Sequence, residues 1–157
     1  MTNTQRTAGI LAAVMMGSLA LLAALPASAQ VGKLIDPNIA AANELQTLPN
    51  MTPAIVKSIL QRRPFKTAVE LNQLLLDQML TPAQARDFYR KAFIPINLNT
   101  GTKPEFLLIP GVGPRMSGEF EEYRPWKTWT QFDKEIGKYV GQEETDRLKQ
   151  YFFIPPR

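Results

Sequence analysis

The segment Pro110-Gly111-Val112-Gly113-Pro114 is the part of the chain whose residue types best suit the binding of a ligand. Its two glycines permit a tight turn with positive φ and a close approach of another group to the backbone. A helix is expected directly after Gly113, and the unpaired N–H groups of a first helical turn attract anions such as a DNA phosphate. Gly111, Gly113 and Arg115 are therefore candidate phosphate-binding residues, with Val112 as an apolar plug turned into the core. A compact helix-to-helix turn that binds nothing explains the same glycines.

Residue types that catalyse reactions or bind metals are scarce. The chain has no histidine and no cysteine, which removes the commonest general base, the commonest metal ligand and every thiol nucleophile. Glu143, Glu144 and Asp146 lie close together in sequence, but a solvated helix face explains them because no second cluster of oxygen ligands accompanies them. We expect a protein that is not an enzyme, with no catalytic residue, no metal site and no cofactor.

From Ile35 onward the chain contains two copies of one sequence unit. A shift of 61 residues aligns Ile35 with Ile96, Glu44 with Glu105, Pro49 with Pro110, and segment 63–67 with 124–128. A shift of 60 residues then aligns Phe93-Ile94-Pro95 with Phe153-Ile154-Pro155. Ordered matches of this kind indicate an internal duplication. We call residues 30–95 copy one and residues 96–157 copy two, and we expect the copies to touch because the junction around Pro95 is too short and apolar for a free linker.

Each copy is predicted to be all-α and to consist of two helical hairpins. Thr-Pro pairs offer an N-cap followed by proline at the first helical position, Thr-x-x-Glu spacing is typical of capping boxes, and apolar residues recur at helical intervals. The predicted helices of copy one are 39–48, 53–62, 67–76 and 82–92, with room for one more turn before residue 39. Those of copy two are 102–109, 114–123, 128–138 and 142–151. No strand alternation is visible.

The positive charge and the glycine loop lie in different copies. Residues 30–95 carry eight Lys or Arg against five acidic residues, whereas residues 96–157 carry nine of each. The matching loop of copy one, Pro49–Pro53, keeps neither glycine, although Asn50 is able to adopt the left-handed conformation. In copy two, Arg115 is followed by three acidic residues, Glu119, Glu121 and Glu122. Nonspecific DNA affinity comes largely from Lys and Arg that displace counterions, so this separation weighs against DNA binding.

Some cations and one tryptophan are candidates for docking on a partner. The basic candidates are Arg62, Arg86, Arg90 and Lys91. The alternative is a solvated helix end, where a cation complements the dipole, and we expect that role for Arg63 and Arg124. Trp126 replaces Phe65 of copy one and is expected in the core. Trp129 replaces Ala68, and we expect it to be exposed as an anchor for a partner.

Residues 1–29 have the pattern of a secretory signal peptide. An uncharged apolar run, Ile10–Leu25, precedes a small-residue cleavage site at Pro26–Ala29. Cleavage is expected rather than an uncleaved anchor, because this segment ends in Ala27-Ser28-Ala29. The apolar run is also somewhat shorter than the roughly 20 residues that span a bilayer. Removal of 29 of the 157 residues leaves 128. We expect an exported chain that is peripheral to a membrane and does not span it.

The motifs Ile96–Thr100, Leu108–Pro114 and Tyr123–Lys127 resemble those of exported helix-hairpin-helix proteins. The resemblance covers nearly all of residues 33–155 and implies tandem helix-hairpin-helix units. Two branches of this family are relevant. Proteins of the ComEA type bind duplex DNA without sequence preference through glycine hairpins. Proteins of the PsbU type have a similar fold without a DNA role, and they protect the oxygen-evolving centre on the lumenal face of photosystem II.

Copy one resembles the PsbU branch in several short stretches. They are Lys33–Asn38, Met51–Lys57, Pro64–Leu71 and Leu80–Gln84. The chain departs from that branch by its second copy, by the intact Gly111-Val112-Gly113 and by the absence of a Tyr-rich Gly-Asp tail after Phe153.

The residues and the resemblance together predict a non-enzymatic extrinsic subunit on the lumenal or periplasmic face of a membrane complex, with photosystem II lumenal subunits as suspected partners. The alternative prediction is a periplasmic DNA-binding protein of the ComEA type.

Overall fold

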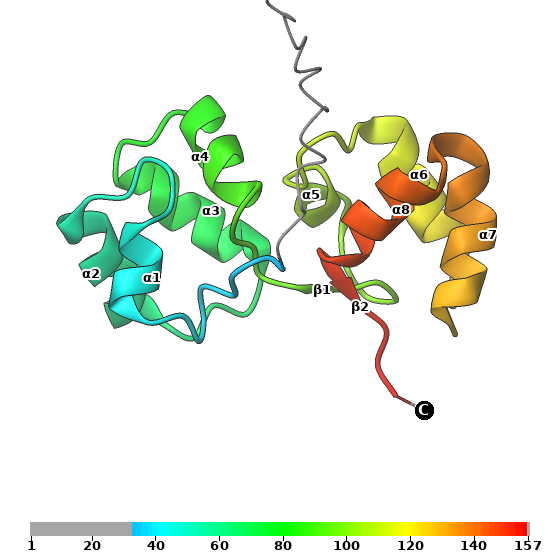
Figure 1. The fold of residues 1–157 in the computed structure, drawn as a ribbon, viewed down its shortest axis with the longest axis horizontal. Helices are drawn as coiled ribbons and strands as arrows, with labels where there is room; N and C mark the ends of the chain where they lie inside the picture. Colours follow the sequence, from blue (N-terminus) through cyan, green and yellow to red (C-terminus); the bar gives the residue numbers. More distant parts are fainter. Residues whose placement is uncertain (1–32, 157) are drawn as a thin grey trace, which may run out of the picture. The chain divides into compact units, whose positions relative to one another are not determined.

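The computed structural model describes residues 33–156, and the expected signal segment 1–29 lies outside them. The described residues all belong to one compact unit, Val31–Arg157, and they are mostly helical (Figure 1). Copy one holds α1 (Ala42–Gln46), α2 (Pro53–Arg62), α3 (Ala68–Asp77) and α4 (Pro82–Tyr89). Copy two holds α5 (Lys103–Phe106), α6 (Pro114–Glu122), α7 (Trp129–Val140) and α8 (Gln142–Lys149).

The helices begin where the capping residues predict. Thr52, Thr67, Thr81 and Thr128 each accept a hydrogen bond from the backbone N–H three residues later. Glu105 closes a capping box by accepting the backbone N–H of Thr102 at 2.9 Å. The first helix of each copy is shorter than predicted, since only Ala42–Gln46 and Lys103–Phe106 are α-helical. Tight turns flank these two short helices, so their apolar residues still face the core without a longer helix.

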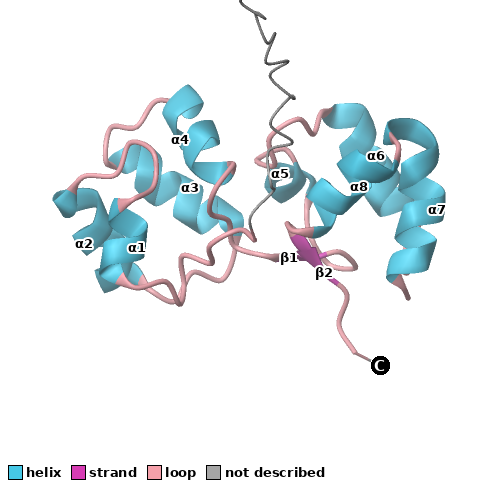
Figure 2. Cartoon of the chain, viewed as in Figure 1, coloured by secondary structure: helices cyan, strands magenta, loops and turns pink. Residues whose placement is uncertain are grey.

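The prediction of no strands was wrong. β1 (Ile96–Asn97) pairs in parallel with β2 (Phe152–Phe153), and these two strands are shown in Figure 2. In copy one, Ile35 forms the matching parallel bridge with Ala92. In each copy the leading segment thus pairs with the segment that leaves the last helix. Pairings this short leave no readable period in the sequence.

An asparagine in each leading segment fixes the bend between the two hairpins of its copy. The Asn38 Oδ1 atom accepts the backbone N–H of Phe65 at 2.8 Å, and its Nδ2 donates to the Phe65 carbonyl at 3.0 Å. Asn99 makes the same two bonds to Trp126, at 2.6 and 2.9 Å. Both partners are buried aromatic residues, with Phe65 and Trp126 only 3% and 1% exposed, which confirms Trp126 as core.

Arg63 and Arg124 are not the solvated helix-end cations that the sequence predicts. The Arg63 guanidinium donates to the Ala40 carbonyl at 2.8 Å, and Arg124 donates to the carbonyls of Leu98 and Gly101. Each arginine therefore ties the end of its hairpin to the leading segment of its own copy. Burial lowers the pKa of Arg63, and the nearby Asp36 carboxylate partly offsets that effect.

The two copies touch, as the short junction predicts. The Tyr151 hydroxyl of copy two donates to the Tyr89 carbonyl of copy one at 3.1 Å, in a buried position. The Tyr151 ring also packs edge-on against Phe93, with ring centroids 5.1 Å apart. Aromatic rings continue through copy two, where Phe120 contacts Phe106, Phe132 and Phe152.

Replacing Asn99 with Ala tests the asparagine bridge. The change removes both bonds to Trp126 and leaves a partly buried N–H and carbonyl without partners. We expect the free energy of unfolding to fall by roughly 2–4 kcal/mol. Chemical denaturation of the mature chain measures it. Thr100→Ala, at the exposed neighbouring position, is the matched control and should change stability by less than about 0.5 kcal/mol. Equal effects of the two substitutions would contradict the role given to Asn99.

Candidate functional site

The loop between α5 and α6, residues 110–114, has the backbone geometry that its glycines predict. Gly111 has φ 87°, a conformation that favours glycine. Val112 is 9% exposed and belongs to the core, as predicted. Gly113 is the N-cap of α6 and has no side chain to bond the first N–H groups of that helix. These groups are therefore free to meet an anion.

The matching loop of copy one, residues 49–53, is closed by its own side chains. Asn50 adopts φ 61°, the left-handed conformation predicted for it. Its Nδ2 atom donates to the Gln84 carbonyl at 3.4 Å, which ties the loop to α4. The Thr52 hydroxyl accepts the Ile55 N–H at 3.3 Å. Because Thr52 occupies an N–H group that Gly113 leaves open in copy two, the first loop is the poorer anion site.

Residues of α8 lie directly against the glycine loop. Arg147 Nη2 donates to the Pro110 carbonyl at 2.8 Å and pairs with Glu144 Oε1 at 2.7 Å. A Cβ atom on Gly111 would lie 3.3 Å from Arg147 Nη2 and 3.8 Å from Glu144 Oε1. The hydrogen bond to Glu144 raises the pKa of Arg147. The Glu144 carboxylate thus partly neutralises the Arg147 charge. Because Glu144 lies beside the loop, it would also repel an approaching phosphate.

Two of the three acidic residues of α8, Glu144 and Asp146, pair with cations. Asp146 contacts Lys149 at 3.0 Å, Glu144 pairs with Arg147, and Glu143 is exposed. Within residues 33–156, no group of three or more acidic side chains is placed to hold a metal ion. These acids therefore stabilise their own helix face.

Arg115 faces a cluster of tyrosines on copy two that the sequence does not reveal. Its guanidinium lies 5.8 Å from the centre of the Tyr139 ring. The Tyr139 hydroxyl lies 3.2 Å from that of Tyr123, which also accepts a bond from Lys138 Nζ at 2.8 Å. The bond to Tyr123 is the largest cause that raises the pKa of Tyr139, to about 12. Residues 16 positions apart in sequence meet here, and no spacing motif signals the contact.

The predicted docking cations are all exposed, but they do not all share one helix. Arg86 lies in the last turn of α4, Arg90 is the C-cap of that helix, and Lys91 follows it. Arg90 lies 3.8 Å from Asp87, with both side chains more than half exposed. Arg62 ends α2, which packs against α1 and α3. The structure therefore supports a group of three cations at the end of α4, with Arg62 on a separate helix.

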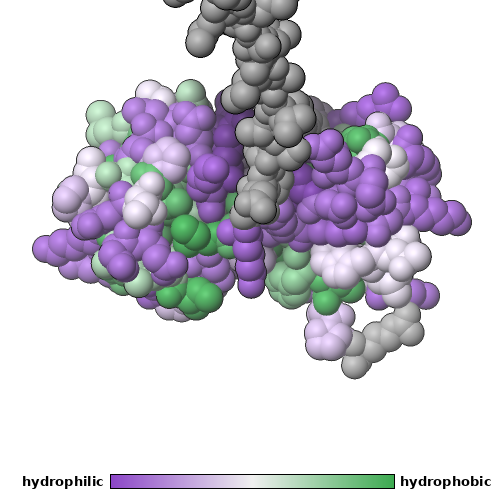
Figure 3. Space-filling model, viewed as in Figure 1, coloured by the Kyte–Doolittle hydropathy of each residue, from purple (hydrophilic) through white to green (hydrophobic). Residues whose placement is uncertain are grey.

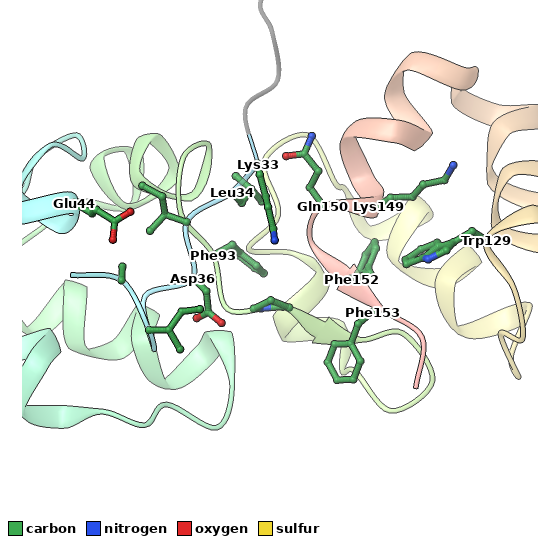
Figure 4. A pocket seen from close by; sticks show the side chains of 14 residues that line it. Lys33, Leu34, Asp36, Glu44, Phe93, Trp129, Lys149, Gln150, Phe152 and Phe153 are labelled. Atoms are coloured by element: carbon green, nitrogen blue, oxygen red, sulfur yellow. The ribbon is translucent and has the colours of Figure 1, made fainter. Parts of the chain in front are cut away.

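Trp129 is half-buried rather than exposed, which corrects the sequence prediction. Its ring packs edge-on against Phe132 with centroids 5.8 Å apart, because it starts α7 next to the core. It also lines an open groove of about 790 Å³ (Figure 4). Phe93 and Pro95 from the junction line the groove. Around them lie seven residues between positions 33 and 44 of copy one and four residues between positions 149 and 153 of copy two.

Comparison of the chain with protein-family models, with curated proteins and with solved structures gives no match. The interpretation of the site therefore rests on the residues and on their geometry.

Alanine substitutions at two glycines test the geometry of the loop. Gly111→Ala places a side chain at φ 87° against Arg147, so we expect a loss of about 1–2 kcal/mol in the free energy of unfolding. Gly118 lies within α6, and a Cβ there meets nothing within 4 Å. Gly118→Ala should stabilise the protein by about 0.5–1 kcal/mol. Thermal and chemical unfolding measure both, and a stabilising Gly111→Ala would overturn the loop assignment.

Proposed function

We propose that this chain is a non-enzymatic docking protein built from tandem helix-hairpin-helix units, and that it works as an extrinsic subunit on the exported face of a membrane complex. The observation that carries the proposal is the contrast between the loops and the basic surface. Thr52 and Asn50 close the first loop, and Glu144 flanks the second. The cations at the end of α4 remain exposed.

Peripheral attachment is consistent with the helices of the chain. Within residues 33–156, no helix combines the length and apolar character needed to cross a membrane. The face shown in Figure 3 is predominantly hydrophilic, with apolar side chains in small separate areas. A protein of this kind attaches to a membrane complex through contacts with its subunits. The resemblance of copy one to the PsbU branch makes lumenal subunits of photosystem II the first partners to test, in the thylakoid lumen of a phototroph; in another bacterium the equivalent compartment is the periplasm.

A salt-release experiment on native membranes tests the docking proposal. Salt screens exposed charge pairs over about 8–10 Å at physiological ionic strength. The protein should sediment with membranes after gentle lysis and leave them in a high-salt wash. Replacing Arg62, Arg86, Arg90 and Lys91 with Ser should lower the salt concentration required for release.

The matched control removes four exposed cations from copy two: Lys103, Arg115, Lys127 and Lys134. It should leave the release profile almost unchanged. A wild-type protein found entirely in the soluble fraction at low ionic strength would contradict the proposal, and so would equal effects of the two sets.

The second candidate function is sequence-nonspecific binding of duplex DNA, as in the ComEA branch. The uncapped first turn of α6 at Gly113 is the observation that favours it. Against it, only one loop is open, and Glu119, Glu121 and Glu122 follow on the same helix. Phosphate contacts dominate DNA affinity, so a single open loop supplies few of them.

Titration of the mature chain with a DNA duplex at low and at physiological salt separates the two functions. The docking proposal predicts weak binding that disappears at physiological salt. Submicromolar affinity at physiological salt, abolished by Gly111→Glu combined with Gly113→Glu, would favour the DNA function. The four-residue copy-two control above should then weaken binding more than the copy-one set, because it includes Arg115.

A further inference from the structure

One tripeptide occurs at equivalent positions in both copies but in two different environments. Phe93 and Ile94 of copy one are 1% and 5% exposed. Phe153 of copy two is 44% exposed, and Ile154 is half-buried. Within the described part of the chain, the tripeptide is therefore buried in copy one and partly exposed in copy two.

The difference arises because copy two covers the first tripeptide. Tyr151 packs against Phe93 and donates to the Tyr89 carbonyl. Within residues 33–156, no element covers Phe153 to the same extent. From there the chain runs away from the helices of copy two (Figure 1). The Phe153 side chain therefore lies exposed on the protein surface, although its backbone belongs to β2 and Ile154 beside it packs partly against the core.

An apolar groove lies beside Phe153. Phe153 belongs to its lining, together with Phe152, Phe93 and Pro95 (Figure 4). Ile39, from the copy-one part of the lining, is 82% exposed. A volume of about 790 Å³ has room for several apolar side chains. The protein thus presents an exposed apolar side chain, Phe153, and an adjacent groove that could receive one.

The charges around the groove balance in total, but its two sides carry opposite net charges. Its charged lining residues are Lys33, Asp36, Glu44 and Lys149, two of each sign. Lys33, Asp36 and Glu44 come from copy one and give that side a net charge of −1, whereas Lys149 gives the copy-two side a charge of +1 (Figure 4). A two-fold axis along the groove would place the acidic side of one molecule opposite Lys149 of another. Lys149 already pairs with Asp133 and Asp146, so these charges would set orientation more than affinity.

We propose that the groove is a self-association surface, in which the Phe153 segment of a second copy of this chain occupies the groove and the contact is reciprocated about a two-fold axis. Such an isologous interface uses the same surface on both molecules and closes at a dimer. In this interface Ile39 of each molecule packs against Phe153 of the other, which buries two of the exposed large apolar side chains of each chain. The proposal does not depend on the function proposed above.

Sedimentation velocity of the mature chain over a wide concentration range tests the dimer. The wild-type sedimentation coefficient should rise with concentration towards that of a dimer and then level off. Ile39→Lys and Phe153→Glu, each alone, should raise the dissociation constant by at least about tenfold, because each places a charge in an apolar contact. Met79→Glu is the matched control, since Met79 is 87% exposed and lies outside the groove lining. Circular dichroism confirms that each variant is folded.

Mixing the two groove variants makes the test specific. In an Ile39→Lys and Phe153→Glu pair, one half of the two-fold contact is native and the other half joins Lys to Glu. The equimolar mixture should therefore recover dimer that neither variant forms alone. A wild-type chain that stays monomeric at every concentration would overturn the proposal. A dimer that both single variants leave intact would also overturn it. A third contrary result is a wild-type monomer whose groove variants are released from native membranes, since the groove would then bind another partner.

Discussion

The two-sided hydrogen bond from an asparagine to the bend between hairpins is the constraint on which each copy depends. Asn38 and Asn99 each satisfy both backbone groups of a buried aromatic residue, Phe65 or Trp126. A buried backbone N–H or carbonyl without a partner costs more than a hydrogen bond contributes. The bond therefore fixes the leading segment against the bend, and the adjacent arginine and the strand pairing then close the copy around its core.

This internal hydrogen-bonded frame is the same in both copies. The copies therefore differ in the volumes of individual core side chains and in the residues of their surface loops. A Cβ atom at Gly101 would clash with Ile96 Cγ2 and would lie 2.8 Å from the Phe106 ring. Copy one has Ala40 and Leu45 where copy two has Gly101 and Phe106, so a smaller residue on the leading segment accommodates a larger one on the first helix. The loops diverge in the same way, since Thr52 closes one and Gly113 leaves the other open. Such a frame allows the surfaces of the two copies to differ without loss of the fold.

The repeat, the helical class and the buried Val112 and Trp126 were predictable because they depend on periodicity and on residue size. The left-handed conformation of Asn50 was predictable because Asn50 occupies the position in copy one that is equivalent to Gly111. Arg63 and Arg124 were misassigned because their carbonyl acceptors lie 23 to 26 residues away, and no local pattern reveals such pairs. The two-residue strands were missed for the same reason. The groove was also not predictable, because its lining comes from segments that are distant in sequence.

Site-specific photo-crosslinking in the native host tests most directly whether this chain works through the copy-one cations or through the glycine loop. A photoreactive amino acid would replace Arg86 on α4 in one strain and Arg115 at the start of α6 in another. The docking account predicts a discrete adduct with a membrane-complex subunit from position 86, and no DNA adduct from position 115. Adducts with DNA from position 115, without any protein adduct from position 86, would contradict it.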